Sequence, residues 1–182
     1  MCAVEVTPVV STERLILRGP VVTDAPAIAA VASDLNVAGM TTSMPHPYGE
    51  ADAEAWVQHA RNCDWEREAM FVIEHRAFGV VGLLGFDHGR GPRPKNGPEI
   101  GYALGRRYWN RGYATEAVRA GLKWVKRDWR KNLVVAGHFA DNPASGQVLC
   151  KAGFLYTGDV ELRPSRARGR DDVPTRMMVW LA

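Results

Sequence analysis

The amino-acid sequence predicts an α/β fold organised as one domain over residues 1–182. Segments with strand periodicity and segments with helical periodicity alternate in the order β-α-α-β-β-β-α-β-α-β-β. Because strands and helices interleave, we expect them to stack in layers around one core, with about seven strands in the sheet. A chain of 182 residues can bury about 70% of the surface that it exposes when unfolded. One domain with a sizeable core is therefore expected.

The elements of the first half follow from periodicity and from helix-capping residues. Residues 14–18 alternate apolar and charged side chains, which is the period of a half-buried strand. A Thr-Asp pair followed by proline begins a helix that is expected over 23–33. Helical spacing of Ala, Trp and Val predicts a second helix over 50–66. Two apolar runs at 71–74 and 80–86, joined by a short turn, predict an antiparallel pair of strands.

The second half continues the alternation. A loop rich in glycine and proline over 87–98 leads into an apolar strand at 99–104. The elements predicted after it are a helix over 116–126, a strand over 133–138, a helix over 143–152, and antiparallel strands over 154–162 and 175–181.

Composition excludes several classes of protein. Apolar residues make up 46% of the chain and charged residues 24%, which are ordinary values for a globular protein. No run approaches the roughly 18 apolar residues of a membrane helix. No basic segment followed by an apolar one marks a secretory signal. A net charge of +3 is too mild to indicate a nucleic-acid surface. We therefore expect a cytoplasmic protein without membrane or nucleic-acid partners.

The cysteines and histidines show no metal-site or disulfide pattern. Cys2, Cys63 and Cys150 lie far apart without C-x-x-C spacing, so neither a disulfide scaffold nor a zinc site is expected. The histidines likewise lack ligand spacing, and no metal is predicted. They are His46, His59, His75, His88 and His138.

A basic loop between the strand at 99–104 and the helix at 116–126 is the most informative segment. It reads Arg-Arg-Tyr-Trp-Asn-Arg-Gly-Tyr-Ala-Thr-Glu-Ala over 106–117. Such a loop can direct several backbone N–H groups at one anion, and Gly112 leaves room for a phosphate to approach. Its spacing matches neither the P-loop nor the dinucleotide fingerprint. A helix N-terminus with solvated arginines is the usual explanation of such a loop taken alone.

Landmarks elsewhere in the chain place this loop in a known pattern. Residues 12–18 read Thr-Glu-Arg-Leu-Ile-Leu-Arg, and Glu-Ile-Gly-Tyr at 99–102 precedes Tyr-Trp-Asn-Arg-Gly-Tyr-Ala-Thr-Glu-Ala at 108–117. Asn-Pro-Ala-Ser at 142–145 and Lys-Ala-Gly-Phe at 151–154 follow. In this order the landmarks resemble the GNAT superfamily of acetyl-CoA-dependent N-acetyltransferases. Within it they resemble the RimJ/RimL ribosomal-protein N-terminal acetyltransferases.

One position departs from the general cradle pattern of that superfamily, in which Gln or Arg stands three residues before the glycine. This chain has Trp109 there, and the RimJ/RimL branch commonly has an aromatic residue. The resemblance implies a twisted, mixed and mostly antiparallel sheet with helices on both faces. It also implies that the fourth and fifth strands splay apart. The pantetheine arm of acetyl-CoA would complete the broken ladder between them, since unpaired buried edges are costly.

The resemblance assigns acetyl-CoA as the co-substrate and divides its binding among three groups. Backbone N–H groups around 102–104 would hold the thioester carbonyl, and those of 110–115 would hold the pyrophosphate with the helix dipole. Arginines beside the loop would add charge, although surface solvation also explains them. The expected contacts are Tyr102, Ala103, Leu104, Arg106, Arg107, Asn110, Arg111, Gly112, Tyr113, Ala114, Thr115, Asn142 and Ser145.

Glu99, Asn142 and Ser145 are the candidate catalytic residues. Attack by an amine needs a base, and Glu99 begins the strand beside the splay; a glutamate facing water is the alternative. Asn142 would bind the pantetheine amides, or form only the turn before Pro143. Many members of the superfamily carry a thiol-protonating Tyr where this chain has Leu149. The RimJ/RimL branch typically lacks it, and Ser145 would assist the sulfur instead, although helix capping also explains this serine.

Two segments are expected to wall the acceptor cleft, namely residues 34–50 and the loop at 163–172. The predicted function is direct transfer of an acetyl group from acetyl-CoA to a primary amine, with a peptide or protein α-amine as one hypothesis. An amino acid, a polyamine or an aminoglycoside is the alternative acceptor. A CoA-binding sensor without turnover is the alternative of another class, and the joint presence of the three candidate catalytic residues argues against it. The resemblance also allows a homodimer.

Overall fold

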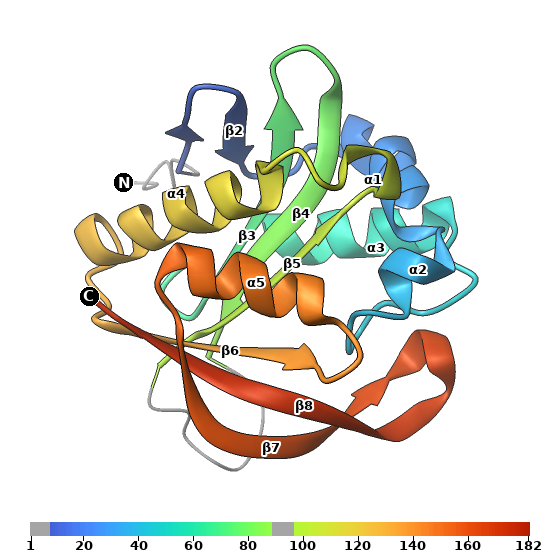
Figure 1. The fold of residues 1–182 in the computed structure, drawn as a ribbon. Coiled ribbons are helices and arrows are strands. Elements are labelled where there is room, and N and C mark those ends of the chain that lie inside the picture. Colours follow the sequence, from blue (N-terminus) through green and yellow to red (C-terminus); the bar gives the residue numbers. More distant parts are fainter. Residues whose placement is uncertain (1–7, 89–96) are drawn as a thin grey trace.

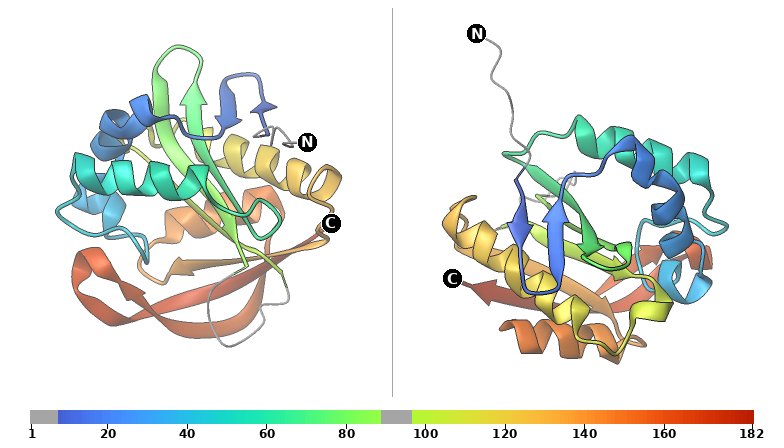
Figure 2. Two further views of the ribbon diagram at one scale, coloured as in Figure 1. Left: turned by 180° about the vertical axis from the view of Figure 1, so that it is seen from behind. Right: turned by 90° about the horizontal axis from the view of Figure 1, so that it is seen from above.

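The computed structural model describes residues 8–88 and 97–182. They form an open sheet of eight strands in the order β1-β2-β3-β4-β5-β6-β8-β7, with helices on both faces (Figure 1, Figure 2). The predicted α/β fold class is confirmed, although the sheet has eight strands and not seven. Cys2 and most of the loop predicted over 87–98 lie outside the described residues.

The sheet is mixed and mostly antiparallel, as predicted. Every neighbouring pair of strands is antiparallel except β5 and β6, which run parallel. The strands are β1 (Val10–Ser11), β2 (Leu15–Arg18), β3 (Glu68–His75), β4 (Gly79–Asp87), β5 (Glu99–Leu104), β6 (Leu133–Phe139), β7 (Leu155–Ser165) and β8 (Arg170–Leu181).

The helices form a layer on each side of the sheet. α1 and α3 cover one face and α4 and α5 the other, as the two views of Figure 2 show. Within the described part of the chain, no helix is long and apolar enough to cross a membrane. The helices are α1 (Ala25–Ala32), α2 (Leu35–Ala38), α3 (Glu50–Arg61), α4 (Tyr113–Arg127) and α5 (Pro143–Ala152).

Some boundaries differ from the prediction for local reasons. β1 has two residues, which pair with 16–17 and are too few to show a period. α2 was missed because it has only four residues, although Asp34 caps it by accepting from a backbone N–H. The helix predicted over 50–66 ends at Arg61, where an asparagine leaves the helical conformation. The last two strands are longer than predicted.

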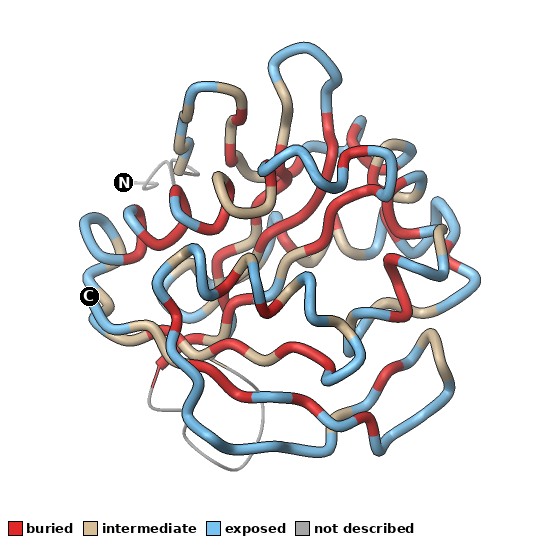
Figure 3. The backbone as a smooth tube through the Cα atoms, viewed as in Figure 1, coloured by how far each residue is buried: buried red, intermediate tan, exposed pale blue. Residues whose placement is uncertain are grey.

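Two apolar clusters hold these layers together. On the α4 side, Phe71 meets Trp124 edge to face with ring centroids 5.3 Å apart. On the α1 side, Ile28 and Val57 pack against Leu83 of β4. Buried positions run along the central strands, whereas β7 is exposed along most of its length (Figure 3). Burial on both faces therefore fixes the central strands, and the functional site is built on them.

The predicted splay lies between β5 and β6. These strands pair only where Glu99 faces Val135 and Ile100 faces Ala136, at the start of β5. From residue 101 onward β5 keeps its ladder with β4 but has no ladder partner on its β6 side. At the far end of β5, the indole Nε1 of Trp109 donates to the carbonyl of Leu104 at 2.8 Å. The result is an open gap in the middle of the sheet, beside the loop that leads to α4.

Candidate active site

The loop predicted to hold a pyrophosphate has the backbone of an anion cradle. α4 begins at Tyr113, earlier than predicted, because Gly112 is its N-cap in the left-handed region with φ 79°. Asn110 also has a positive φ, of 60°. Among the described residues, no side chain caps this end of α4. The N–H groups of its first turn, which have no intrahelical partners, can therefore bind an anion.

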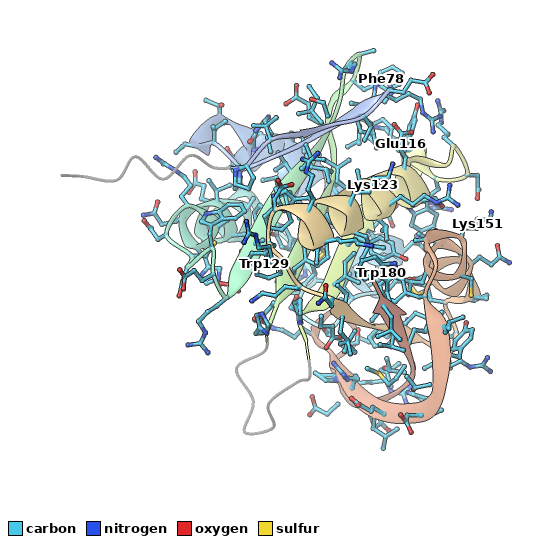
Figure 4. The ribbon with its side chains drawn as sticks, turned by 90° about the vertical axis from the view of Figure 1, so that its left-hand side faces the viewer. Phe78, Glu116, Lys123, Trp129, Lys151 and Trp180 are labelled. Atoms are coloured by element: carbon cyan, nitrogen blue, oxygen red, sulfur yellow. The ribbon has the colours of Figure 1, made fainter. Side chains whose placement is uncertain are left out.

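The turn between β1 and β2 contacts this cradle from the side. The Glu116 carboxylate accepts from the Thr12 hydroxyl at 2.6 Å and from Nε of Arg14 at 2.7 Å, and it lies on α4 beneath the N-terminal hairpin (Figure 4). Nη1 of Arg14 donates to the carbonyl of Arg111 at 3.0 Å. The Arg14 guanidinium also lies over the Tyr113 ring, 4.7 Å from its centroid. The landmark at residues 12–18 thus holds the cradle loop in place.

The three arginines of the cradle have different neighbours. Arg106 lies 4.0 Å from the Asp34 carboxylate, and its side chain is exposed. Arg107 stacks on the Tyr108 ring, with its guanidinium carbon 4.7 Å from the centroid. Arg111 is exposed, and its contact with Arg14 is made by its carbonyl. All three are solvated in part, and their contacts with phosphate stay a prediction.

A cleft of about 730 Å³ crosses the sheet at the splay. It reaches from α3 on one side to α5 on the other, and both segments predicted to wall it contribute residues. The two walls also touch, because the Arg166 N–H donates to the Thr42 carbonyl at 3.2 Å and Nε of Arg168 donates to the Gly39 carbonyl at 2.5 Å. The two walls are therefore joined by hydrogen bonds along one part of the rim of the cleft.

Glu99 lines this cleft on the α3 side and is paired with Arg163 of β7. Nη1 of Arg163 lies 3.1 Å from Oε1 of Glu99, and Nη2 lies 2.6 Å from Glu161. Burial acts to lower the pKa of Arg163, but the two carboxylates outweigh it and raise this pKa above its ordinary value. The Glu99 side chain is 19% exposed, so it is largely withdrawn from water. Its role as a base stays a prediction.

Glu99 is the last member of a row of carboxylates on the α3 face. In the sheet register, Glu68 of β3 faces Asp87 of β4, and Asp87 faces Glu99 of β5. Like charges at directly opposed positions destabilise a sheet. His59 of α3 lies 3.0 Å from Glu68, and Arg163 pairs with Glu99. A basic side chain therefore stands at each end of the row. All three carboxylates line the cleft, and His59, Arg163 and Arg166 line it beside them.

Asn142 and Ser145 lie on the other side of the gap, at the start of α5. Asn142 is the N-cap, and its side-chain oxygen accepts from the Ser145 N–H at 3.2 Å. The capping role is thus filled by Asn142, and the Ser145 hydroxyl lies 2.8 Å from the Tyr102 phenol oxygen. Leu149, one turn further on, is 1% exposed and also lines the cleft. Burial raises the pKa of Tyr102 to about 12, although the Ser145 hydrogen bond acts to lower it.

Sequence reasoning missed the side chains of Tyr102 and Arg163. Tyr102 was expected to contribute only its backbone, yet its phenol reaches α5. The alternation of a strand could have revealed this, because Ile100, Tyr102 and Leu104 share the face that α4 and α5 cover. Arg163 gave no such signal, since it is 64 residues from Glu99 in the chain. Across residues 8–88 and 97–182, no group of three or more His, Cys, Asp or Glu is placed to hold a metal ion.

Comparison with known proteins agrees with this geometry. The model of the acetyltransferase (GNAT) domain family matches residues 14–155. The uncharacterized N-acetyltransferase YoaA of Bacillus subtilis is 28% identical over 164 residues, which cover 83% of this chain and 85% of YoaA. RimJ of Mycobacterium smegmatis, solved with a CoA-disulfide, has a TM-score of 0.80 at 20% identity over 97% of this chain and 88% of that one. Spermidine N-acetyltransferase of Vibrio cholerae, solved with CoA and spermine, has a TM-score of 0.74 at 16% identity over 93% and 96%.

The open, mostly antiparallel sheet with helices on both faces matches the fold of these solved acetyltransferases. The chain belongs to the GNAT acetyltransferase family, because the family model covers most of its length. Acetyl-CoA suits the residues present: the open N–H groups of α4 fit its pyrophosphate, and the free edge of β5 fits the amides of its pantetheine arm. The protein is therefore an acyltransferase.

Proposed function

We propose that this protein transfers the acetyl group of acetyl-CoA directly to a primary amine that enters the cleft from the α3 side. The observation that carries the proposal is the cleft itself, which passes through the gap between β5 and β6. Glu99 lies on the acceptor side of that gap, and Ser145 lies on the α5 side. An amine and a thioester can therefore meet in the gap without a covalent enzyme intermediate.

In this mechanism the ammonium form of the acceptor releases one proton to solvent before the attack, and Glu99 accepts the second proton as the neutral amine attacks, directly or through a water. The N–H groups of β5 around Tyr102, Ala103 and Leu104 hold the oxyanion that develops on the carbonyl. As the C–N bond forms and the C–S bond breaks, the electron pair of the C–S bond goes to the sulfur. The Ser145 hydroxyl, with Asn142 fixing its turn of helix, donates a hydrogen bond to that sulfur.

The acceptor side of the cleft supports a cationic acceptor. The row of Glu68, Asp87 and Glu99 supplies negative charge, and apolar side chains such as Trp56 and Met70 line the walls. A primary amine arrives mostly as an ammonium ion, which the carboxylates of this row attract. A second charge on the acceptor, as in a polyamine or a basic peptide N-terminus, would gain further from the row.

Two of the expected acceptor classes each have a solved structure in their favour. The resemblance to the RimJ/RimL branch and the likeness to RimJ favour a peptide or protein α-amine. The likeness to a spermidine N-acetyltransferase favours a small polyamine. The acidic row suits both, and a cytoplasmic location is consistent with either.

Acetyl-CoA-dependent thiol release tests the proposal. The panel holds short peptides with free Ser, Ala or Met N-termini, polyamines, amino acids and an aminoglycoside, against a blank without amine. Release that depends on one of these amines is expected and names the acceptor class. No release above the blank, with acetyl-CoA binding shown by a thermal shift, would favour the alternative of a CoA-binding sensor.

The Glu99→Gln variant tests the base. We expect kcat to fall about 100-fold, within the usual range for loss of a general base, with unchanged acetyl-CoA binding. Glu161→Gln is the matched control, because Glu161 is the other carboxylate partner of Arg163. The Glu161 side chain is half exposed. A large loss in both variants would assign the effect to the ion pair. Equal turnover by Glu99→Gln and the parent protein would remove Glu99 from the mechanism.

A further inference from the structure

We propose that the Tyr102 side chain is a positioning residue for departure of the thiol: it orients the Ser145 hydroxyl so that this hydroxyl donates to the leaving sulfur. The inference rests on the proposed acetyl transfer. It adds a second donor, from a different element, behind the serine on α5.

The geometry links the two residues across the splay. Tyr102 lies on β5, on the face that α5 covers, and its phenol oxygen is 2.8 Å from Oγ of Ser145. The same phenol also donates to the Ser145 carbonyl at 3.1 Å. Both side chains line the cleft where it passes through the sheet. The pair therefore bridges the two elements that border the gap.

A count of protons leaves two arrangements of the pair. The phenol has one proton, and so does the serine hydroxyl. Asn142 already fills the capping role at this end of α5, so the Ser145 hydroxyl is released from it. When the phenol donates to the Ser145 carbonyl, the serine hydroxyl donates to the phenol oxygen. When the phenol donates instead to Oγ of Ser145, which is the arrangement that we infer for departure of the thiol, the serine proton can point into the cleft. A sulfur in the gap then accepts a hydrogen bond from the serine hydroxyl, which itself accepts one from the phenol.

The phenol keeps its proton throughout the neutral range. Burial raises the pKa of Tyr102 to about 12, and the hydrogen bond with Ser145 only partly opposes this. Tyr102 is thus a hydrogen-bond donor and not the source of a transferred proton. In the step itself the C–N bond forms, the C–S bond breaks and its electron pair goes to the sulfur, which departs as a hydrogen-bonded thiolate. The proton of the amine goes to Glu99, so atoms and charges balance.

A purely structural role for Tyr102, as a tie between β5 and α5, makes a different prediction. Loss of such a tie would lower stability and the affinity for acetyl-CoA, whatever residue stands at 145. A positioning role acts through Ser145, so its loss has no further effect once that hydroxyl is gone.

The first experiment needs no acceptor amine. The thiol of CoA bound to the protein is titrated by its ultraviolet thiolate absorbance in the parent protein, Tyr102→Phe, Ser145→Ala and the double variant. We expect Tyr102→Phe to raise the pKa of the bound thiol, corresponding to about a three- to tenfold loss of thiolate stabilisation, which is typical of one hydrogen bond. The double variant should match Ser145→Ala. An unchanged thiol in Tyr102→Phe, or CoA that fails to bind at all, would overturn the proposal.

The second experiment measures turnover with the best amine of the panel. Tyr102→Phe should lower kcat about three- to tenfold while the KM for acetyl-CoA stays within twofold. In the Ser145→Ala background the same substitution should change kcat by less than twofold. If the losses of kcat in the two single variants multiply in the double variant, or if only the KM rises, Tyr102 is a structural tie between β5 and α5. Tyr156→Phe is the matched control, since its hydroxyl bonds His138 at 2.9 Å and not Ser145.

The two readouts separate the two proposals. A bound thiol that responds to Tyr102 in a protein without amine-dependent release would overturn acetyl transfer and leave only the hydrogen bonds from Tyr102 through Ser145 to the sulfur. Turnover by the parent protein with a thiol that does not respond would overturn the role of Tyr102 alone.

Discussion

The contacts between the cradle and the turn that joins β1 to β2 make Glu116→Gln an informative perturbation. The glutamine keeps one acceptor oxygen, so the bonds from the Thr12 hydroxyl and from the Arg14 N–H to Oε1 can persist. It loses the charged bonds from Nε and Nη2 of Arg14 to Oε2, at 2.7 and 2.6 Å. The guanidinium that also holds the Arg111 carbonyl is then released. The substitution therefore separates the ion pair from the rest of the contact.

The expected size follows from the exposure of the pair. Hydrogen bonds between charged groups contribute about 1.5–3 kcal/mol, but Arg14 is 41% exposed, so we expect about 1–2 kcal/mol of lost stability. For a chain of 182 residues this corresponds to a Tm lower by about 2–8 °C. Ordering one released residue of the cradle costs the ligand about 1–2 kcal/mol. The affinity for acetyl-CoA should therefore fall about 5- to 30-fold.

The measurement is the KM for acetyl-CoA together with the Tm of the unliganded protein. Asp128→Asn is the control, because it breaks the Arg127–Asp128 ion pair at the other end of α4, far from the cradle. That control should leave the KM unchanged. A Tm that falls in Glu116→Gln while the KM stays within twofold would refute the reasoning, since the N-terminal hairpin would then stabilise the fold without positioning the cradle.

Two further predictions concern the cradle glycine and a buried ion pair. Gly112→Ala forces a side chain into a backbone with φ 79°, which costs about 1–2 kcal/mol, and should raise the KM for acetyl-CoA about 5- to 30-fold. Gly79→Ala, at φ 69° in open space, should lower the Tm alike without changing that KM. Burial raises the pKa of Asp24, but Arg18 and a backbone N–H outweigh it and hold this pKa below 3.8. The stability that the Asp24 carboxylate contributes is therefore present above about pH 4 and lost as the pH falls further. Thermal melts of Asp24→Asn should show a Tm about 4–12 °C lower at pH 7 and a weaker dependence of the Tm on acid pH than in the parent protein. Curves of Tm against pH that run parallel in the two proteins would contradict this.

The order of elements was predictable because each strand and helix of useful length carries its own period. Residues 14–18 alternate, and the apolar face of α4 recurs at helical spacing, so both were found without tertiary information. β1 and α2 have two and four residues, fewer than either period needs to repeat. Their existence depends on contacts with other parts of the chain, and the sequence alone predicted neither.

The candidate site also has a part that the sequence predicted and a part that it did not. The cradle was predictable because its glycine, its basic loop and its helix are contiguous in the chain. The neighbours of Glu99 were not, because Arg163 reaches it from β7 and the carboxylate row depends on the register of three strands. Register is a property of paired strands, so a single segment carries little information about it. The α3 side of the cleft is built mainly from such long-range contacts. The Glu99–Arg163 pair and the carboxylate row therefore emerged only from the fold.

The alternation of β5 also explains how one short strand can serve both halves of the proposed reaction. Glu99 and Gly101 face α3, whereas Tyr102 faces α5, because successive side chains point to opposite faces of a sheet. The proposed base and the donors to the sulfur are therefore kept on opposite sides of the gap, where they cannot pair with each other. A side chain built at Gly101 would meet no atom within 4 Å, so the strand leaves the space beside Glu99 open. An amine arriving over that open position would find the base on its own side and the leaving group on the far side, which is the arrangement that direct transfer requires.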